Sequence, residues 1–563
     1  MSVHHDRGQR AILTAREVLA SLISAGIREL VLSPGSRSAP LAYAAAEAEA
    51  AGKLRVHVRI DERSAAFMAL GLSQASCTPV ALAATSGSAI GQMLPAVMEA
   101  NHTATPLLVL SADRPDELHG TGASQTTKQK TLFGEHVRAA LNVAAGECPK
   151  EAIAQALAAL RGSDALPAGP VQLNLQFRDP LTPEDASRID AQPWTHITAG
   201  TWEENRRQAA WEPPAQEGRR TVVVAGHGAG VEAQEFARVQ GLPLFAEPSS
   251  NARFGENAIG HYRPLIAVGQ ERIERVVLFG RPTLSRPVGR LLADPRIEAA
   301  IWEPAPAPWY EPGRRREQPI SDPAALQEFA GAGPDGWLES WKTLDAQAGQ
   351  LRTASDAGEP LNGAAVAQVL WSAQLPMLLI GSSNIVRDFD LAAVPAAEQL
   401  GRAFANRGLA GIDGTISTAL GLALASGERT VAVMGDITFA HDAGSMVWTR
   451  GEARPTLDVV VYNDQGGAIF STLEHGAVAA SGRYASSVDR FFGTEQVMNI
   501  RALAEGYGWK YHRVEQASQL RDLMAGSEPG ALRIIEVPAS REHLRAENLE
   551  LNQLIGALGW PGE

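Results

Sequence analysis

The residues best suited to chemistry follow two short apolar runs in the last third of the chain. Asp436 comes soon after the run 430–434, and Asn463 comes directly after the run 459–462. If both runs are parallel strands, the interval between these side chains leaves room for a helix and places them at one sheet edge. A carboxylate, an amide oxygen and the main-chain carbonyl of Gln465 are hard oxygen ligands of the kind that Mg²⁺ or Mn²⁺ takes. The spacing therefore predicts a divalent-metal site.

Glycines adjoin both candidate metal ligands. Gly435 precedes Asp436 and Gly466 follows the second run, so the main chain can approach a diphosphate closely at both places. Gly-Asp and Asn-Asp pairs also make ordinary turns after strands, but the two together at this interval favour the metal site. The distance along the chain from Asp436 favours Asn463 as the second metal ligand. The distance to the glycine pair Gly466 and Gly467 favours Asp464 instead. We predict Asn463.

Glu62 is the next residue suited to chemistry. It follows the apolar run 56–60 and opens a segment with Ala65, Phe67 and Leu70 on its next turns. A carboxyl group held among apolar neighbours can exchange a proton near neutral pH, as a general acid or base does. An acidic residue in the first turn of a helix also has an ordinary electrostatic role. We therefore predict a catalytic role for Glu62 only because the metal site is predicted in the same chain.

Strands and helices must position these residues, and apolar runs alternate with alanine-rich amphipathic segments along most of the chain. The alternation is typical of βαβ units in a mainly parallel sheet, which binds ligands beyond the carboxyl ends of its strands. We predict strands at 29–32, 56–60, 80–84, 107–110, 221–225, 243–246, 276–279, 377–380, 430–434, 459–462 and 533–537, and helices at 39–51, 63–75 and 90–100.

A chain of 563 residues is too long for one hydrophobic core, and about two to four domains are expected. The stretch 198–220 is rich in Trp, Glu, Arg and Pro and lacks the periodicity of a strand or a helix, which is typical of a linker. The irregular stretches 303–322 and 353–363 bracket a second boundary. The sequence therefore predicts an α/β fold with three consecutive domains, at residues 1–190, 200–350 and 356–563.

Composition narrows the class of protein. Lys and Arg number 50 against 63 Asp and Glu, and the formal net charge of -13 argues against nonspecific binding to nucleic acid. Local basic clusters could still bind small anions. With only Cys77 and Cys148, the chain has neither a disulfide framework nor a CxxC pair. It also shows no signal-like start and no run of about 18 apolar residues, so we expect a cytoplasmic globular protein without a membrane span.

Together these features resemble the thiamine diphosphate-dependent enzyme superfamily. Gly435 and Asp436 followed by Asn463 are similar to its cofactor–metal motif, and Glu62 is similar to the glutamate that contacts the cofactor's aminopyrimidine ring. The three-domain order resembles the pyrimidine-binding, central and diphosphate-binding domains of that superfamily. The resemblance implies thiamine diphosphate and Mg²⁺ or Mn²⁺ as cofactors and a thiamine diphosphate-binding fold.

Further motifs lie at residues 33–38, 61–63, 111–115, 122–125, 406–408 with 411–414, and 466–470. Together they resemble one family in that superfamily, the 2-succinyl-5-enolpyruvyl-6-hydroxy-3-cyclohexene-1-carboxylate synthases of menaquinone biosynthesis. These transferases decarboxylate 2-oxoglutarate and add the resulting succinyl semialdehyde carbanion equivalent to isochorismate, releasing CO₂. The resemblance also implies a homodimer with shared active sites, or a dimer of dimers.

The resemblance implies two sets of site residues. Both substrates are polyanions, and arginine binds carboxylates with two parallel hydrogen bonds, although a single arginine is more often a surface charge. The usual Asn-Asn of the metal motif is replaced by Tyr462 and Asn463 or by Asn463 and Asp464, depending on where one residue is gapped. The substrate set is Ser36, Arg37, Arg114, Gln125, Ser383, Arg387, Arg407 and Phe470, and the cofactor set is Glu62, Ile412, Gly435, Asp436, Asn463, Gly466, Ile469 and Leu473.

Two alternatives remain open. Another thiamine-dependent carboligase or 2-oxo acid decarboxylase acts on less anionic substrates, so the arginine set disfavours it. A non-catalytic subunit of the same fold is expected to lack Glu62 or Asp436, and the chain has both.

Overall fold

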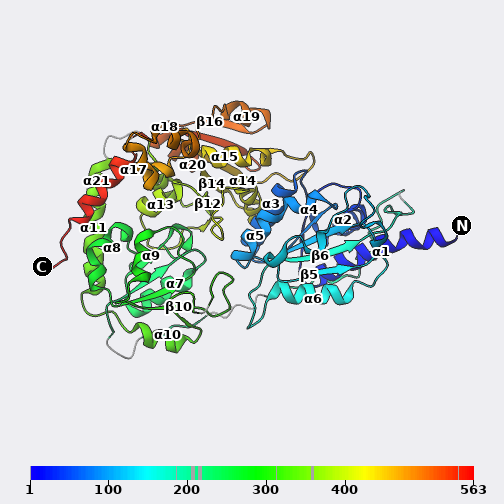
Figure 1. Cartoon of the computed structure of the whole chain (residues 1–563), viewed down its shortest axis with the longest axis horizontal. Helices are drawn as coiled ribbons and strands as arrows, with labels where there is room; N and C mark the ends of the chain where they lie inside the picture. The colour runs from blue at the N-terminus through cyan, green and yellow to red at the C-terminus, as the bar shows by residue number, and fades with distance from the viewer. Residues whose placement is uncertain are drawn as a thin grey trace.

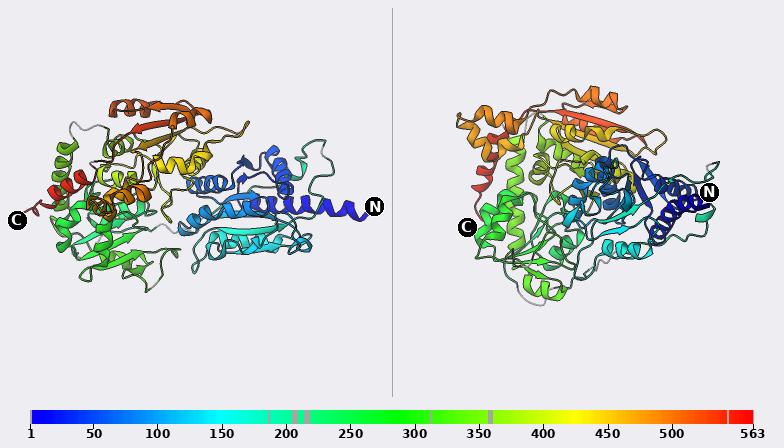
Figure 2. Two further views of the ribbon diagram at one scale, coloured as in Figure 1. Left: turned by 45° about the horizontal axis from the view of Figure 1, so that its top comes forward. Right: turned by 45° about the vertical axis from the view of Figure 1, so that its right-hand side comes forward.

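The computed structural model confirms an α/β fold, with three parallel sheets that follow one another along the chain. Figure 1 shows the first unit at the right in blue and cyan, and the second, in green, below the third, in yellow to red. Figure 2 shows the two termini at opposite ends of the molecule. Among the described residues, no helix has both the length and the apolar composition that a membrane span needs. The structure describes residues 2–185, 187–203, 209–213, 218–311, 313–356, 361–542 and 544–562.

The first unit is a six-stranded sheet in the order β2-β1-β3-β4-β6-β5, with helices on both faces. Alternate residues of a strand point to opposite faces, so Leu30 packs with α1, α2 and α6 whereas Val31 packs with α3, α4 and α5. The elements are α1 (Ser2–Ser24), β1 (Glu29–Leu32), α2 (Ala39–Ala50), β2 (Arg55–Val58), α3 (Glu62–Ser76), β3 (Val80–Ala84), α4 (Ser88–Gln92), α5 (Leu94–His102), β4 (Leu107–Asp113), β5 (Ala140–Val143), α6 (Lys150–Arg161) and β6 (Val171–Gln176).

Three features of this unit differ from the sequence prediction. The strand predicted to end at Ile60 ends at Val58. The helix predicted at 90–100 is split, because Pro95 lies in the first turn of α5 and has no N–H to continue the preceding helix. Strands β5 and β6 were not predicted, and β6 alternates Gln and Asn with apolar residues while all of it is buried.

The second unit is a five-stranded sheet in the order β11-β10-β9-β7-β8. Strand β11 lies inside the segment 303–322 that the sequence predicts to be irregular, and β10 was also not predicted. The elements are β7 (Thr221–Ala225), α7 (Val231–Gln240), β8 (Leu244–Ala246), α8 (Tyr262–Gly269), β9 (Arg275–Phe279), α9 (Arg286–Ala293), β10 (Glu298–Trp302), β11 (Gln318–Ile320), α10 (Pro323–Ala330) and α11 (Trp337–Asp356).

The third unit repeats the topology of the first, with the order β13-β12-β14-β15-β17-β16. Helices α12, α13 and α20 cover one face, and α14 and α19 cover the other. The elements are α12 (Gly363–Ser372), β12 (Met377–Ile380), α13 (Ile385–Ala392), β13 (Arg402–Phe404), α14 (Thr415–Ser426), β14 (Thr430–Gly435), α15 (Asp436–Asp442), β15 (Leu457–Asn463), α16 (Ile469–Thr472), α17 (Glu474–Ala480), α18 (Ala485–Val488), α19 (Ile500–Gly506), β16 (Lys510–Arg513), α20 (Ala517–Ala525) and β17 (Leu532–Pro538).

The C-terminal segment returns to the second unit. Helix α21 (Leu544–Gly556) buries Ile555 in the core that α8 and α11 share. Beyond it, the Trp560 ring lies 5.6 Å from Trp337 and 5.5 Å from Trp341, with the Arg272 guanidinium 4.9 Å from its centroid. The last residues of the segment predicted as the third domain therefore complete the core of the second unit.

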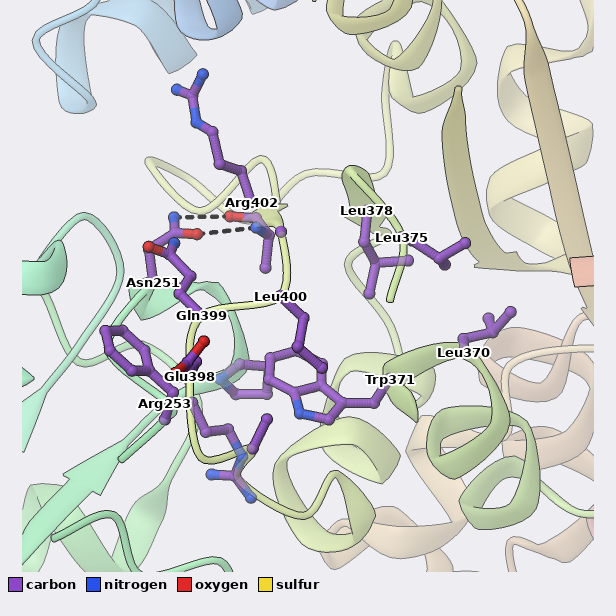
Figure 3. Close-up of a pocket in the computed structure, with 15 residues that line it drawn as sticks. Asn251, Arg253, Leu370, Trp371, Leu375, Leu378, Glu398, Gln399, Leu400 and Arg402 are labelled. Atoms are coloured by element: carbon purple, nitrogen blue, oxygen red, sulfur yellow. Dashed lines mark hydrogen bonds between the residues drawn. The ribbon is translucent and has the colours of Figure 1, made fainter. Parts of the chain in front are cut away.

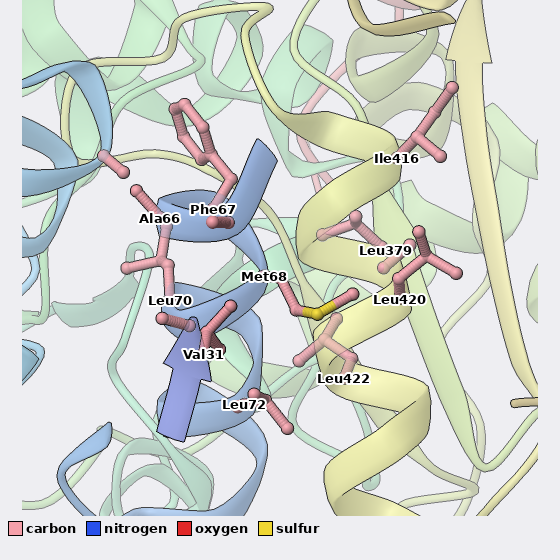
Figure 4. Close-up of a cluster of buried hydrophobic side chains, with 14 of the residues drawn as sticks. Val31, Ala66, Phe67, Met68, Leu70, Leu72, Leu379, Ile416, Leu420 and Leu422 are labelled. Carbon is pink, nitrogen blue, oxygen red and sulfur yellow. The ribbon is translucent and has the colours of Figure 1, made fainter. Parts of the chain in front are cut away.

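Helices α3 and α14 join the first unit to the third (Figure 4). Their backbones come very close, because a β-carbon at Gly71 would lie 2.1 Å from Thr418 O and one at Gly421 would lie 2.2 Å from Met68 O. Phe67 and Ile416 belong to the same buried apolar cluster. This close crossing fixes the N-terminal end of α3, where Glu62 stands, against the third unit.

Each sheet has a switch point at which the strand order reverses, between β1 and β3, β7 and β9, and β12 and β14. Ligands of open α/β sheets bind beyond the carboxyl ends of the strands at such points. The segments 33–38 and 85–88 follow β1 and β3, and the segment 381–384 and Asp436 follow β12 and β14. The predicted site residues therefore lie at the carboxyl edges of the first and third sheets, and Arg37, Ser383 and Asp436 lie at the two switch points.

Candidate active site

Asp436 and Asp464 form a buried acidic pair at the carboxyl edge of the third sheet. Asp436 begins α15 after β14, and Asp464 follows the neighbouring strand β15. Burial raises the pKa of Asp436 to about 6. Burial and the charge of Asp436 together raise the pKa of Asp464 to about 7. A cation bound between two such carboxylates relieves their repulsion.

Asn463, which the interval from Asp436 selects, is tied to the neighbouring strand β17 through its amide nitrogen. Its Nδ2 donates a hydrogen bond to Glu536 Oε1 at 2.7 Å, and its Oδ1 accepts from the Gln465 N–H at 3.3 Å. The bond to Glu536 follows from strand alternation, because Asn463 shares a face of β15 with Val461, and Val461 is the register partner of Glu536. The carboxylate on which the charge of Asp436 acts is Asp464, the alternative that the glycine pair selects.

The turn after the acidic pair contains two successive residues with positive φ, and the second of them is a glycine. Gln465 has a φ of 59° and Gly466 a φ of 143°. A β-carbon at Gly466 would lie 2.0 Å from Arg541 Nη1 and 2.3 Å from Gly493 O. The Gly467 N–H donates to the same Gly493 carbonyl at 2.7 Å. Glycine at position 466 therefore lets Arg541 and the Gly493 carbonyl pack directly against the main chain of this turn.

Three apolar residues of the two predicted sets follow this turn. Ile469, Phe470 and Leu473 lie on and just after α16 and are half-buried. The Phe470 ring centroid is 5.4 Å from that of Phe492, and the His475 ring stacks on Phe492 at 4.3 Å. These side chains form an apolar cluster beside the buried carboxylates.

Arg407 and Arg387 lie at the same sheet edge. Arg407 is buried, and it donates from Nε to Thr283 Oγ1 at 2.9 Å and from Nη2 to Thr283 O at 2.8 Å. Arg387 donates to Ser383 O at 2.6 Å. Burial and the charge of Arg407 lower the pKa of Arg387 to about 10. A β-carbon at Gly435 would lie 3.6 Å from Ser383 Oγ, so the segment that carries Arg387 begins close to the residue before Asp436.

Arg37 and Arg114 form a second pair, in the first unit. Arg37 donates to Phe177 O at 2.8 Å, and Arg114 donates to Gln125 O at 3.1 Å. Burial and the charge of Arg37 lower the pKa of Arg114. Ser36 and Gln125 are exposed beside them. The two arginine pairs, one in each terminal unit, are concentrated positive charge in an acidic protein, which suits polyanionic ligands.

Glu62 occupies the first turn of α3, with Asp61 as its N-cap. None of the hydrogen bonds and ion pairs formed by the described residues includes the Glu62 carboxylate, in contrast to its neighbours. Arg63 donates to His441 O at 3.1 Å, and Ser64 Oγ lies 2.8 Å from Ser445 Oγ. The helix end is thus fixed by its neighbours while the carboxylate of Glu62 stays available to a ligand.

Ile412 lies in the loop between β13 and α14 and is half-buried. The loop packs against α3, because a β-carbon at Gly414 would lie 1.9 Å from Phe67 Cγ. Ile412 O accepts a hydrogen bond from Thr415 Oγ1 at 3.1 Å. The residue therefore lies on a loop that is held between the first and third units.

Sequence reasoning missed the polar network behind the Arg37–Arg114 pair. Ser86 accepts a hydrogen bond from Arg114. Gln129 accepts from the Gly87 N–H at 3.1 Å and donates to Asn174 Oδ1 at 2.8 Å. The signal was present as the alternating Gln and Asn residues of β6, which are polar yet fully buried.

A separate pocket lies at the other end of the third sheet (Figure 3). Trp371, Leu375 and Leu400 give it an apolar lining, and it adjoins the starts of β12 and β13. Asn251 donates to Ala403 O at 2.9 Å and accepts from the Ala403 N–H at 2.8 Å. Because the pocket adjoins the amino ends of the strands, it is not part of the site at their carboxyl ends.

The residues at the third-unit switch point fit a diphosphate and a divalent cation. Asp436 Oδ1 is buried without a hydrogen-bond partner among the described residues, and a metal ion would satisfy it. The described residues contain no cluster of three His, Cys, Asp or Glu side chains able to hold a metal alone. This donor set matches Mg²⁺, which takes one or two carboxylates and completes its shell with phosphate oxygens and water.

Comparison with known proteins agrees with this geometry. The N-terminal TPP-binding domain of thiamine pyrophosphate enzymes matches residues 13–132, and the C-terminal TPP-binding domain matches residues 389–529. Fold and site together define a thiamine diphosphate-dependent enzyme. Proteins named 2-succinyl-5-enolpyruvyl-6-hydroxy-3-cyclohexene-1-carboxylate synthase from Paenarthrobacter aurescens and Renibacterium salmoninarum are 51% and 49% identical to the chain, each over 97% of both sequences. One from Arthrobacter is 50% identical over 97% of this chain and 92% of its own. The chain belongs to the family of these synthases.

Proposed function

We propose that the chain decarboxylates 2-oxoglutarate and adds the remaining four-carbon unit to isochorismate, which yields 2-succinyl-5-enolpyruvyl-6-hydroxy-3-cyclohexene-1-carboxylate and CO₂ for menaquinone biosynthesis. The observation that carries the proposal is a buried acidic pair, Asp436 and Asp464, at the same sheet edge as Arg387 and the buried Arg407. The acidic pair suits the metal diphosphate of the cofactor, and the arginines suit the carboxylates of both substrates. The names of the relatives supply the product.

In this proposal Mg²⁺ or Mn²⁺ is held by Asp436, by Asp464 in place of Asn463, and by a main-chain carbonyl of the Gln465–Gly466 turn. Buried acidic oxygens, one of them without a partner, support this set. Bound thiamine diphosphate supplies the carbon nucleophile of the reaction. Gly435 and Gly466 allow the main chain to reach the diphosphate.

The chain's own side chains then orient and protect the substrates. Arg407, Arg387 and Ser383 would hold carboxylates beside the reacting carbon, and Arg37, Arg114, Gln125 and Ser36 would hold them from the side of the first unit. Ile469, Phe470 and Leu473 would exclude water, with Ile412 supporting the cofactor from the α3 side. Glu62 would hold a proton at the aminopyrimidine ring of the cofactor.

The proposal includes a homodimer in which Glu62 of one copy completes the site of the other. The unpaired Glu62 carboxylate and the 62% exposure of neighbouring Ile60 support a surface that a second copy covers. Mixing tests this directly. Glu62→Gln and Asp436→Ala, each inactive alone, should regain about a quarter of wild-type activity after mixing if sites are shared and subunits exchange freely. Activity that stays absent, although mixed dimers are detected by mass, would place each site within one copy.

The main experiment measures the reaction itself. Purified protein is given thiamine diphosphate, Mg²⁺, 2-oxoglutarate and isochorismate, and isochorismate loss is followed by absorbance beside CO₂ release. We expect turnover that needs every component and that falls by at least about a hundredfold in Glu62→Gln. CO₂ release with isochorismate unchanged would keep the cofactor chemistry and reject the acceptor. If the protein binds the cofactor but does not turn over 2-oxoglutarate, 2-oxoglutarate is rejected as the donor substrate as well.

A further inference from the structure

The segment that carries Arg407 lies where all three units meet. This segment follows β13 of the third unit. The backbone N–H groups of the two residues after Arg407 donate to one carboxylate of the first unit. Glu99 of α5 accepts from the Gly408 N–H at Oε1, 2.6 Å, and from the Leu409 N–H at Oε2, 2.7 Å. The second unit contributes Arg281, which donates to Gly408 O at 2.5 Å. The first and second units thus both hold the main chain beside Arg407.

A second carboxylate holds the guanidinium through one intermediate residue. Glu247, which follows β8 in the second unit, accepts from the N–H groups of Thr283 at 2.8 Å and Leu284 at 2.9 Å, and lies 3.3 Å from Thr283 Oγ1. Thr283 in turn accepts both hydrogen bonds that Arg407 donates to the second unit. The turn at Thr283 is therefore fixed from behind by Glu247 and presents two acceptors to Arg407.

Burial of both carboxylates costs folding free energy. Glu99 is 3% exposed and Glu247 is 1% exposed. Burial raises the pKa of Glu99, and it raises the pKa of Glu247 to about 7. A buried acid is retained at a cost when it satisfies buried donors, and here those donors belong to the Arg407 segment and to its supporting turn.

We propose that Glu99 and Glu247 are positioning residues that set the orientation of the Arg407 guanidinium for substrate binding. This inference rests on the proposed function, which makes Arg407 a substrate-binding residue. It gives the second unit a role in the site, because that unit supplies Thr283 and Glu247.

The two glutamates respond differently to the same substitution. Each Glu99 oxygen serves one backbone N–H, so the amide in Glu99→Gln can accept only one and leaves a buried donor unpaired. At Glu247 the N–H groups share Oε1, and the NH₂ group of Gln could donate to Thr283 Oγ1. Glu99→Gln and Glu247→Ala should therefore disturb Arg407, whereas Glu247→Gln should preserve it.

The test compares these variants with Glu29→Gln. Glu29 is 3% exposed and accepts from Arg55 and His57, but it lies at the start of β1, at the sheet edge opposite the switch point. We expect Glu99→Gln and Glu247→Ala to raise the KM of a carboxylate substrate by about tenfold or more, as the loss of a well-placed charged hydrogen bond does. Glu247→Gln and Glu29→Gln should keep the wild-type KM, and all four variants should keep the wild-type affinity for thiamine diphosphate.

A double-mutant cycle separates positioning from general loss of structure. In an Arg407→Ala background, Glu99→Gln should add no further rise in KM, because the group it positions is gone. An additive rise, or a rise in KM as large in Glu29→Gln, would overturn the proposal.

Hydrogen exchange tests the same inference without substrates. Amides of residues 406–410 should exchange faster in Glu99→Gln than in wild type or Glu29→Gln. If the proposed substrates prove wrong, wild type shows no turnover while this exchange difference still appears. Unchanged exchange in Glu99→Gln would reject the inference whatever the substrates are.

Discussion

Asn463 and Glu536 are joined by a 2.7 Å hydrogen bond from Nδ2 to Oε1, which ties the side chain of Asn463 to β17 and leaves Asp464 beside Asp436. The same glutamate accepts from the Tyr511 hydroxyl at 2.5 Å. The end of β15 is thus anchored on one side by Asn463, while the next residue turns its carboxylate toward the switch point. Asn463 therefore supports the turn of Asp464 and Gln465 from behind.

This arrangement predicts different metal dependences for two neighbouring residues. Asp464→Ala should raise the Mg²⁺ concentration needed for half-maximal activity by more than about a hundredfold, since it removes a charged ligand. Asn463→Ala should raise it by about tenfold or less, because it loosens only the support of the loop. Magnesium titrations of activity check this, and the reverse ranking would restore Asn463 as the ligand.

The arginine pairs should govern affinity for anionic substrates. Arg387→Ala and Arg114→Ala should each lower kcat/KM by about a hundredfold or more, because a bidentate contact to a carboxylate is lost in a partly dry site. Arg296→Ala removes the same charge from an exposed pair with Asp294 in the second unit and serves as the control. Steady-state kinetics with both substrates check this, and equal losses in all three variants would point to a general charge effect.

Glu247 predicts a pH dependence of stability. Burial raises its pKa to about 7, so between its unfolded value and that pH the folded chain binds a proton that the unfolded chain releases. Its contribution is complete below the unfolded pKa and is lost as pH rises through about 7. The charged groups Asp390 and Arg407 act on it in opposite directions.

Glu247→Gln should therefore gain stability relative to wild type as pH rises from about 5 to about 8, because the amide carries no proton to lose. We expect the Tm difference between the two proteins to change by a few degrees, on the order of 3 °C, over this interval. Thermal scans at several pH values check the sign, and a constant difference would mean that Glu247 does not titrate there.

The crossing of α3 and α14 predicts opposite effects for two helical glycines. Gly421→Ala places a methyl group 2.2 Å from Met68 O, so the helices must separate, and we expect a loss of about 3 kcal/mol or more. Gly506→Ala in α19 meets nothing within 4 Å and should stabilise the helix by about 0.5 to 1 kcal/mol. Denaturant unfolding of both variants checks this, and a neutral Gly421→Ala would show that the crossing tolerates separation.

The sequence by itself determined the framework of this protein. All eleven predicted strands are present with small shifts at their ends, because apolar runs must be buried wherever a sheet forms around them. The acidic and glycine residues of the cofactor motif could be found in the sequence, because the chemistry depends on residue types that directly follow those strands. The distance to the glycine pair also pointed to Asp464, although the sequence alone could not distinguish Asp464 from Asn463 as the ligand.

Tertiary structure decided which side chains meet. The face of the sheet on which Asn463 lies depends on the register between β15 and β17. Strand β6 is buried, although alternating Gln and Asn with apolar residues is typical of a half-exposed strand. Glu99 acquires its partner Gly408 only when segments 309 positions apart pack together, and the partners of Glu247 lie 36 and 37 positions along the chain. Local periodicity encodes whether a segment is a strand or a helix, because burial alternates along it. The partner of a polar side chain is set by contacts between distant segments, which no local pattern contains.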